Sequence, residues 1–100
     1  MSRVIFSIKY SVYPDKLEKY LKKISYLRDL LAAENYDYSV YRDKKNPYEF
    51  EEIYIFESFE DFENFDDAVS DEISGIIFEV TNNYVVDKKL VYKTLVEIED

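Results

Sequence analysis

The sequence contains no cysteine, no histidine and no tryptophan, and it has one glycine and two prolines among 100 residues. Without cysteine, the chain forms no disulfide and offers no thiolate nucleophile or thiolate metal ligand. Without histidine, it lacks the commonest general base and the commonest metal ligand. The sequence also has no phosphate-binding loop, dinucleotide fingerprint or nucleophile elbow. We therefore expect neither a bound metal nor a cofactor.

A long apolar run is also missing, because no stretch of about 18 apolar residues occurs, and a membrane span is not expected. The segment Met1–Phe6 lacks the apolar core of a signal peptide. The formal net charge is −9, which argues against a nucleic-acid partner, because phosphate neutralisation requires lysine and arginine. These features predict a cytoplasmic protein with no nucleic-acid partner and no membrane partner.

The chain does have a large apolar and aromatic fraction: 47% of its residues are hydrophobic and 18% are Phe or Tyr. This composition indicates a folded chain, and the length predicts a single domain over residues 1–100. The charge is uneven, since residues 1–50 carry 10 basic and 7 acidic side chains, whereas residues 51–100 carry 3 and 15. The acidic clusters at 60–63 and 66–67 lack the spacing of a calcium loop, so they indicate a solvated helix face.

Hydrophobic periodicity predicts six elements. Alternating apolar residues predict a strand at about 4–12, and an i, i+3/i+4 stripe after Pro14 predicts a helix over 14–33. Strands at 36–42 and 49–57 flank a turn at 43–47 and form a hairpin. Ser58 begins a helical region over 59–83 that breaks near Ser70, and a last strand covers 90–98. The order β-α-β-β-α-β predicts an α+β ferredoxin-like fold, with both helical regions on one face of a four-stranded antiparallel sheet.

The predicted strands are apolar on both faces. Ile5 lies on the more polar side of the first strand, and Ile53 and Tyr54 face opposite ways on the third. In a monomeric antiparallel sheet the face away from the helices is usually polar, and a large exposed apolar patch favours aggregation. A second copy of the sheet is the simplest cover. We therefore predict a homodimer that forms a dimeric α/β barrel through sheet-to-sheet packing.

The hairpin and the segment after it carry a recognisable series of residues. Residues 38–43 read Tyr-Ser-Val-Tyr-Arg-Asp, Asn46 and Pro47 follow, and residues 56–58 read Phe-Glu-Ser. This series resembles the antibiotic-biosynthesis-monooxygenase family, whose members commonly show Tyr-x-x-Tyr-Arg-Asp, Asn-Pro and a strand ending in Trp-Glu-Ser before a short acidic helix. The resemblance implies a ferredoxin-like dimeric barrel. Proteins similar to this family pattern include cofactorless quinone-forming monooxygenases, heme-degrading oxygenases, autoinducer-handling proteins and many with no known reaction, so the resemblance specifies the fold more than the activity.

The chain departs from the family pattern at three places. Phe56 stands where the family has its tryptophan, and Glu52 stands where some quinone-forming members carry a polar amide. Heme-degrading members place a histidine near Asp66 or Asp67, and without it an iron would lack its usual protein ligand. The resemblance therefore favours a small-molecule monooxygenase that acts on an aromatic or quinone-type substrate without a dedicated cofactor.

A cofactorless oxidation needs an apolar pocket, a group that accepts the substrate proton and donors for the developing oxyanion. Period two places Glu52, Tyr54 and Phe56 on one face of the third strand, while Ser7 and Lys9 are the polar pair of the first strand. The candidate catalytic residues are therefore Glu52, Lys9 and Tyr54. The candidate pocket-lining residues are Phe56, Ser7, Phe62 and Tyr38.

Each candidate also has a purely structural interpretation. Glu52 is typical of a surface or edge carboxylate, and Phe56 is typical of a core residue. Lys9 is typical of a side chain that either snorkels to water or pairs with an acid. The 11 tyrosines suit ordinary strands and interfaces as well as a pocket. A second hypothesis is thus a non-catalytic small-ligand-binding or structural dimer. A filled core would favour this second hypothesis, and a ligand-sized cavity containing Glu52 or Lys9 would favour the enzyme.

Overall fold

The computed structural model describes residues 2–99, so the first and last residues of the predicted 1–100 domain lie outside it. The described strands are β1 (Val4–Ser11), β2 (Asp37–Arg42), β3 (Glu49–Phe56) and β4 (Val91–Val96). The described α-helices are α1 (Leu17–Ala33), α2 (Phe59–Ala68) and α3 (Asp71–Glu79). Three short helical turns complete the chain: η1 (Pro14–Lys16), η2 (Val80–Tyr84) and η3 (Val86–Lys88).

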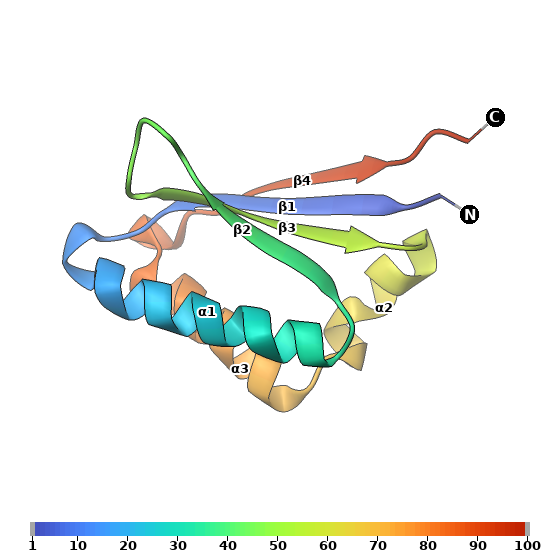
Figure 1. Ribbon diagram of the computed structural model, residues 1–100, viewed down its shortest axis with the longest axis horizontal. Helices are drawn as coiled ribbons and strands as arrows, with labels where there is room; N and C mark the ends of the chain where they lie inside the picture. Colours follow the sequence, from blue (N-terminus) through green and yellow to red (C-terminus); the bar gives the residue numbers. More distant parts are fainter. Residues whose placement is uncertain (1, 100) are drawn as a thin grey trace.

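The four strands form one antiparallel sheet in the order β2-β3-β1-β4. Figure 1 shows the three α-helices together on one side of this sheet, and within residues 2–99 no helix lies on the other side. The predicted β-α-β-β-α-β order and the α+β ferredoxin-like class are therefore confirmed. The strand bounds differ from the predicted ones by one or two residues at most ends, where ladder hydrogen bonds rather than side-chain pattern decide the limit.

Helix α1 is amphipathic and packs beneath the sheet. Its buried residues are Tyr20, Ile24, Leu27 and Leu31, which recur at the spacing of one helical face. Its lysines lie mainly on the exposed side. The helix ends at Ala33, and the following Asn35 takes a positive φ of 67°, a conformation that asparagine adopts more readily than most residues. This turn directs the chain into β2.

Two serines cap the helices on either side of the break predicted near Ser70. The Ser58 hydroxyl accepts a hydrogen bond from the Asp61 amide at the start of α2, at 3.1 Å. The Ser70 hydroxyl accepts one from the Ile73 amide at the start of α3, at 3.3 Å. Serine is a preferred N-cap because its oxygen satisfies an otherwise unpaired amide. The predicted helical region over 59–83 is therefore two helices and a final π-helical turn, η2.

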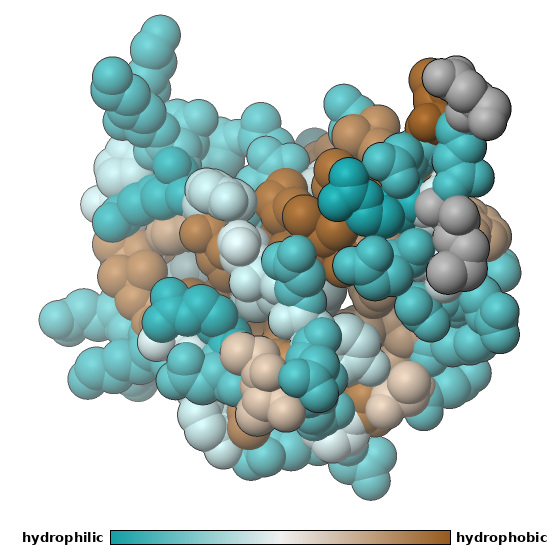
Figure 2. Space-filling model, turned by 45° about the vertical axis from the view of Figure 1, so that its right-hand side comes forward, coloured by the Kyte–Doolittle hydropathy of each residue, from teal (hydrophilic) through white to brown (hydrophobic). Residues whose placement is uncertain are grey.

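The two faces of the sheet have different surroundings. The helix-facing side contains the buried residues Val4, Tyr10, Phe50, Glu52, Tyr54 and Phe56. The other side, here called the open face, carries residues of the opposite parity, including Ile5, Ser7, Lys9, Tyr41, Ile53, Ile55 and Leu95. Ile5 is 37% exposed and Leu95 49%, and Figure 2 shows apolar side chains reaching the molecular surface among hydrophilic ones. The chain by itself covers one face only.

Strand β4 lies at the edge of the sheet and is exposed along its whole length. It pairs with β1, and an additional hydrogen bond joins the Glu97 amide to the Arg3 carbonyl at 2.8 Å. The Arg3 side chain also pairs with the Glu97 carboxylate at 3.1 Å. Among residues 2–99, no helix combines the length and apolar character needed to cross a bilayer.

Candidate functional site

A cavity of about 390 Å³ lies between the helix-facing side of the sheet and helices α2 and α3. This volume is within the range of small-molecule sites, which is roughly 300–1,000 Å³. Five elements of the fold contribute to its walls. The lining residues are Phe6, Ile8, Tyr54, Phe56, Phe62, Glu63, Phe65, Asp66, Ile77 and Tyr92.

The strand register brings the sheet residues of this cavity together. Phe6 on β1 pairs directly with Tyr54 on β3, and Ile8 pairs with Tyr92 on β4. Because directly paired residues share a face, all four side chains point toward the helices. Phe56, two residues after Tyr54, points the same way. The sheet floor of the cavity is therefore fixed by long-range pairing of three strands.

The lining rings contact one another in a continuous series. The Phe6 and Phe62 ring centroids are 5.3 Å apart, and Phe62 lies 5.6 Å from Phe56. Phe56 in turn lies 5.5 Å from Phe65, which is 5.2 Å from Tyr54. These separations are typical of tilted and edge-to-face aromatic pairs, each of which stabilises by about 0.5–1.5 kcal/mol beyond area burial. The rings therefore form a mutually supported apolar wall.

Polar groups enter the cavity at a few points. Glu63 and Asp66 come from α2 and are exposed, so they stand between the apolar wall and solvent. Tyr54 supplies a buried hydroxyl-bearing ring from the sheet. Burial raises the pKa of Tyr54, and the nearby carboxylates of Glu52 and Asp66 raise it further. Tyr54 is thus held as a neutral phenol that can donate a hydrogen bond.

A buried polar network lies next to Tyr54, deeper in the core. The Tyr38 hydroxyl donates a hydrogen bond of 2.5 Å to Glu52 Oε1, and the Tyr10 and Tyr20 hydroxyls are 2.7 Å apart. Burial raises the pKa of the Glu52 carboxyl, and hydrogen bonds from Tyr38 and Tyr10 partly offset that effect. Burial also raises the pKa of Tyr10 and of Tyr38, and the Glu52 charge adds to the shift. Several phenols therefore surround one buried carboxyl group.

The structure places the catalytic candidates in three different surroundings. Tyr54 lines the cavity. Glu52 is only 5% exposed and lies behind the lining, so its interpretation as a surface or edge carboxylate is wrong. The carboxyl is tolerated there because Tyr38 and Tyr10 satisfy it. Lys9 lies on the open face and pairs with Glu49 at 2.9 Å, which confirms the prediction that it pairs with an acid.

The pocket-lining candidates are also divided between the two sides of the sheet. Phe56 and Phe62 line the cavity. Tyr38 is buried on the helix-facing side, with its ring 4.7 Å from that of Tyr54, but it does not line the cavity. Ser7 is buried on the open face, opposite Ile53 on the neighbouring strand. The odd-numbered positions of β1 thus point away from the helices.

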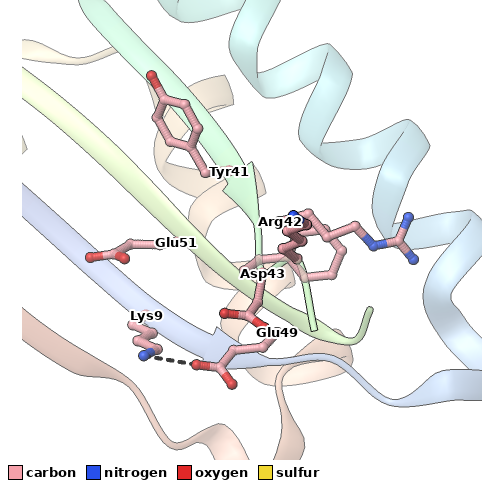
Figure 3. A pocket seen from close by; sticks show the side chains of 8 residues that line it. Lys9, Tyr41, Arg42, Asp43, Glu49 and Glu51 are labelled. Atoms are coloured by element: carbon pink, nitrogen blue, oxygen red, sulfur yellow. Dashed lines mark ion pairs between the residues drawn. The ribbon is translucent and has the colours of Figure 1, made fainter. Parts of the chain in front are cut away.

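A second, smaller pocket of about 250 Å³ lies at the hairpin end of the sheet. Figure 3 shows Lys9 and Glu49 joined by their ion pair, with Tyr41 and Glu51 nearby and Arg42 pointing the other way. The Arg42 guanidinium instead lies 5.4 Å from the centre of the Phe50 ring. Six of the eight lining residues are charged, and four of them already have partners: Lys9, Glu49, Arg42 and Asp43. It lacks the apolar walls of the larger cavity.

Sequence reasoning missed seven lining residues: Phe6, Ile8, Glu63, Phe65, Asp66, Ile77 and Tyr92. The two acids were grouped with a solvated helix face. One signal was available in the sequence. Phe62 and Phe65 share an apolar stripe, and Glu63 and Asp66 directly follow them in the chain. The remaining acids of α2 do not line this cavity. Among the described residues, no group of three or more acidic, histidine or cysteine side chains could hold a metal ion.

Comparison with known proteins supports the fold. No family model and no curated protein sequence matches the chain. A conserved protein from Methanosarcina mazei Go1 is 18% identical with a TM-score of 0.79, covering 95% of this chain and 92% of that one. A protein from Caulobacter crescentus described as an antibiotic biosynthesis monooxygenase is 14% identical with a TM-score of 0.80, covering 98% and 92%. The fold is that of the antibiotic biosynthesis monooxygenases.

This monooxygenase-like fold extends over nearly the whole chain. A further structure with that description, from Nitrosomonas europaea, is 11% identical with a TM-score of 0.73 and covers 94% of this chain and 86% of that one. The resemblance first read from the hairpin is therefore matched by the architecture. At these identities the likeness concerns the fold, so the chemistry has to be argued from the cavity.

Proposed function

We propose that this protein is a small-molecule monooxygenase of the antibiotic-biosynthesis type that oxidises an aromatic substrate without a dedicated cofactor. The aromatic cavity carries the proposal, because it is large enough for a ring system and its apolar wall would exclude water. The monooxygenase-like fold of the solved relatives supports it. A ligand-sized space does remain between the sheet and the helices, which argues against a filled core, but neither Glu52 nor Lys9 lines it.

The chemistry would need only oxygen and a phenolic substrate. One phenol and one O₂ give one quinone and one water: one oxygen atom becomes the second carbonyl, and the other leaves as water with the hydroxyl and ring hydrogens. The substrate loses four electrons and O₂ gains them. In this proposal the neutral Tyr54 donates a hydrogen bond to the substrate oxygen, and the Asp66 carboxylate at the cavity mouth accepts the substrate proton.

The remaining catalytic candidates would have indirect roles. Glu52 lies behind Tyr54, so we assign it the role of fixing the surrounding tyrosines through its bond to Tyr38. Lys9 lies on the open face, away from the cavity. Its role in the proposal is structural, through its pair with Glu49.

Oxygen uptake with a panel of phenols and hydroquinones tests the activity. We expect uptake above the buffer rate for at least one substrate, with quinone formed in equal amount. Tyr54→Phe should lower kcat by about 100-fold, the usual effect of removing one oxyanion donor. Tyr41→Phe is the matched control, because this tyrosine is on the open face and 61% exposed. Equal rates for Tyr54→Phe and the parent protein would contradict the role of Tyr54.

The second candidate is a non-catalytic small-ligand-binding protein on the same fold. One observation favours it: the buried carboxyl group nearest the cavity, Glu52, is not among the lining residues. Binding of aromatic probes without any oxygen uptake across the panel would establish this second function. Oxygen uptake that depends on Tyr54 would exclude it.

We also propose that two copies associate through their open faces to form the dimeric barrel. The support is the apolar content of this face, where Ile53, Ile55 and Leu95 gather around β1. Two-fold packing would remove these side chains from water on both copies, and burial of each large aliphatic side chain stabilises by about 1.5–3 kcal/mol. Light scattering should give twice the monomer mass of 12.1 kDa.

A further inference from the structure

We propose that the ligand of the aromatic cavity is a cation, namely an aromatic molecule that carries a protonated amine. This inference rests on the proposed function, because it names the substrate class of the same site. The cavity joins an aromatic wall to exactly two charged side chains, and both are carboxylates. No lysine or arginine is among its lining residues.

The two lining carboxylates are not neutralised by a basic side chain. The ion pairs within residues 2–99 are Arg3–Glu97, Lys9–Glu49, Lys23–Glu79 and Arg28–Asp29. Neither Glu63 nor Asp66 has a lysine or arginine partner in that part of the chain. Both lining carboxylates therefore have no basic ion-pair partner among residues 2–99, and a cationic ligand could supply one.

The surrounding chain strengthens this negative field. Residues 57–79, which include all of α2 and α3, contain nine acidic residues and no lysine or arginine. A concave apolar surface beside charges of one sign concentrates their field and attracts ligands of the opposite sign. An anionic ligand, such as a carboxylate or a free phenolate, would be repelled at the same place.

The aromatic wall favours the same class of ligand. Faces of Phe, Tyr and Trp rings attract an ammonium group within about 6 Å of the ring centre. The lining rings of Phe62 and Phe65 belong to the same helix as Glu63 and Asp66. A protonated amine at the mouth would thus meet carboxylates and ring faces together, while the aromatic body of the ligand would occupy the apolar interior.

A positive charge on the substrate would also help the proposed oxidation. Loss of the phenol proton creates a negative charge beside Glu63 and Asp66, which by themselves oppose it. An ammonium group on the same molecule offsets that charge, so the deprotonated substrate stays neutral overall. The preference for a cationic ligand therefore follows from the carboxylates and aromatic rings of the cavity. It is also consistent with loss of the phenol proton in the proposed oxidation.

Three probes that share one ring system test the inference: 1-naphthylmethylamine, 1-naphthalenemethanol and 1-naphthoate. Their dissociation constants are measured by calorimetry at neutral pH in low and high salt. We expect the amine to bind at least about tenfold more tightly than the alcohol, and the carboxylate to bind most weakly. The difference in dissociation constant between the amine and the alcohol should become smaller in high salt, because exposed carboxylates are screened by ions.

A pair of double variants assigns the effect to the lining carboxylates. Glu63→Gln with Asp66→Asn should bring the amine to within about twofold of the alcohol. Glu60→Gln with Asp67→Asn removes the same charge from exposed positions of α2 that do not line the cavity, and it should keep most of the preference. Thermal unfolding of both variants checks that the fold is intact. An equal loss in both variants would overturn the assignment to Glu63 and Asp66.

The outcomes separate this inference from the proposed function. Equal binding of all three probes would overturn the charge preference and leave the cavity as an aromatic site. Tighter binding of the carboxylate would overturn the preference as well. Failure of every probe to bind would overturn both the inference and the aromatic-substrate proposal.

Discussion

The helix-facing side and the open face of this sheet are built from the same strands, but their residues differ in burial. On β3, Tyr54 is buried against the helices, while its neighbour Ile55 points to the open face and is only partly buried. On β2, Tyr38 is buried and Tyr41 is 61% exposed. Apolar character alone therefore does not bury a strand residue. The packing partner on that side of the sheet does so.

The polar groups of the two sides differ in the same way. On the helix-facing side, Glu52 is buried and depends on Tyr38 and Tyr10 for its hydrogen bonds. On the open face, Lys9 and Glu49 form a partly exposed ion pair that water can replace. Removing a partner of a polar group should thus lower the stability of the fold strongly on the helix-facing side and only weakly on the open face.

The largest difference in the free energy of unfolding should appear when one buried tyrosine and one tyrosine of the open face are each replaced by alanine. Tyr20 packs against the helix-facing side and is fully buried, so Tyr20→Ala should lower the free energy of unfolding by about 3–5 kcal/mol. Tyr41→Ala on the open face should change it by less than about 0.5 kcal/mol in the monomer. Urea unfolding at low protein concentration measures both. Similar losses for the two variants would mean that the open face is covered in solution.

A charge on the open face should separate assembly from folding. Leu95→Lys should raise the dissociation constant of the proposed dimer by roughly 100-fold or more, because the change occurs twice across a two-fold interface. Light scattering should then give the monomer mass, while circular dichroism stays unchanged. Phe78→Lys is the control, since Phe78 is 70% exposed on α3, away from the sheet. A parent protein that is already monomeric would refute the dimer.

Removal of one tyrosine hydroxyl from each face of the sheet should give a smaller difference in unfolding free energy. Tyr38→Phe deprives the buried Glu52 of one of its two donors, while Tyr10 remains, and should cost about 1–3 kcal/mol of unfolding free energy, the usual penalty when a buried polar group loses a partner. Tyr41→Phe removes an exposed hydroxyl and should be neutral. Denaturant melts of the two variants provide the comparison. A neutral Tyr38→Phe would show that Glu52 does not need this bond.

The smallest expected effect concerns pH. Since burial raises the pKa of Glu52 above its usual 4.5, the folded protein binds this proton more tightly than the unfolded chain. The corresponding stability is complete below pH 4.5 and is lost as pH rises through the folded-state pKa. Glu52→Gln should therefore make the unfolding free energy less dependent on pH above 4.5. Parallel pH profiles for variant and parent would contradict the raised pKa.

Local sequence patterns were reliable for the elements themselves. The spacing of Tyr20, Ile24 and Leu27 marks one face of α1, and Ser58 and Ser70 mark the starts of α2 and α3. These signals depend on neighbouring residues, so they survive in any tertiary context. The same holds for the hairpin turn, where the Asp43 carboxylate accepts hydrogen bonds from two following amides.

The candidate site was less predictable because it is assembled from distant segments. Period two shows that Ser7 and Lys9 share a face, but the pairing of Phe6 with Tyr54 decides that this face is opposite the cavity. No local pattern contains that register. Likewise, an acid on α2 reaches the cavity or only solvent according to how the helix lies on the sheet.

The sequence by itself determined the order of the elements, the antiparallel α+β class and the apolar character of both sheet faces. Those properties follow from side-chain periodicity and capping, which act over a few residues. Tertiary structure alone decided that Glu52 is buried among tyrosines and that Glu63 and Asp66 stand at the mouth of an aromatic cavity. These relationships join residues far apart in the chain, and the physical cause is the register of the strands and the placement of α2 against them.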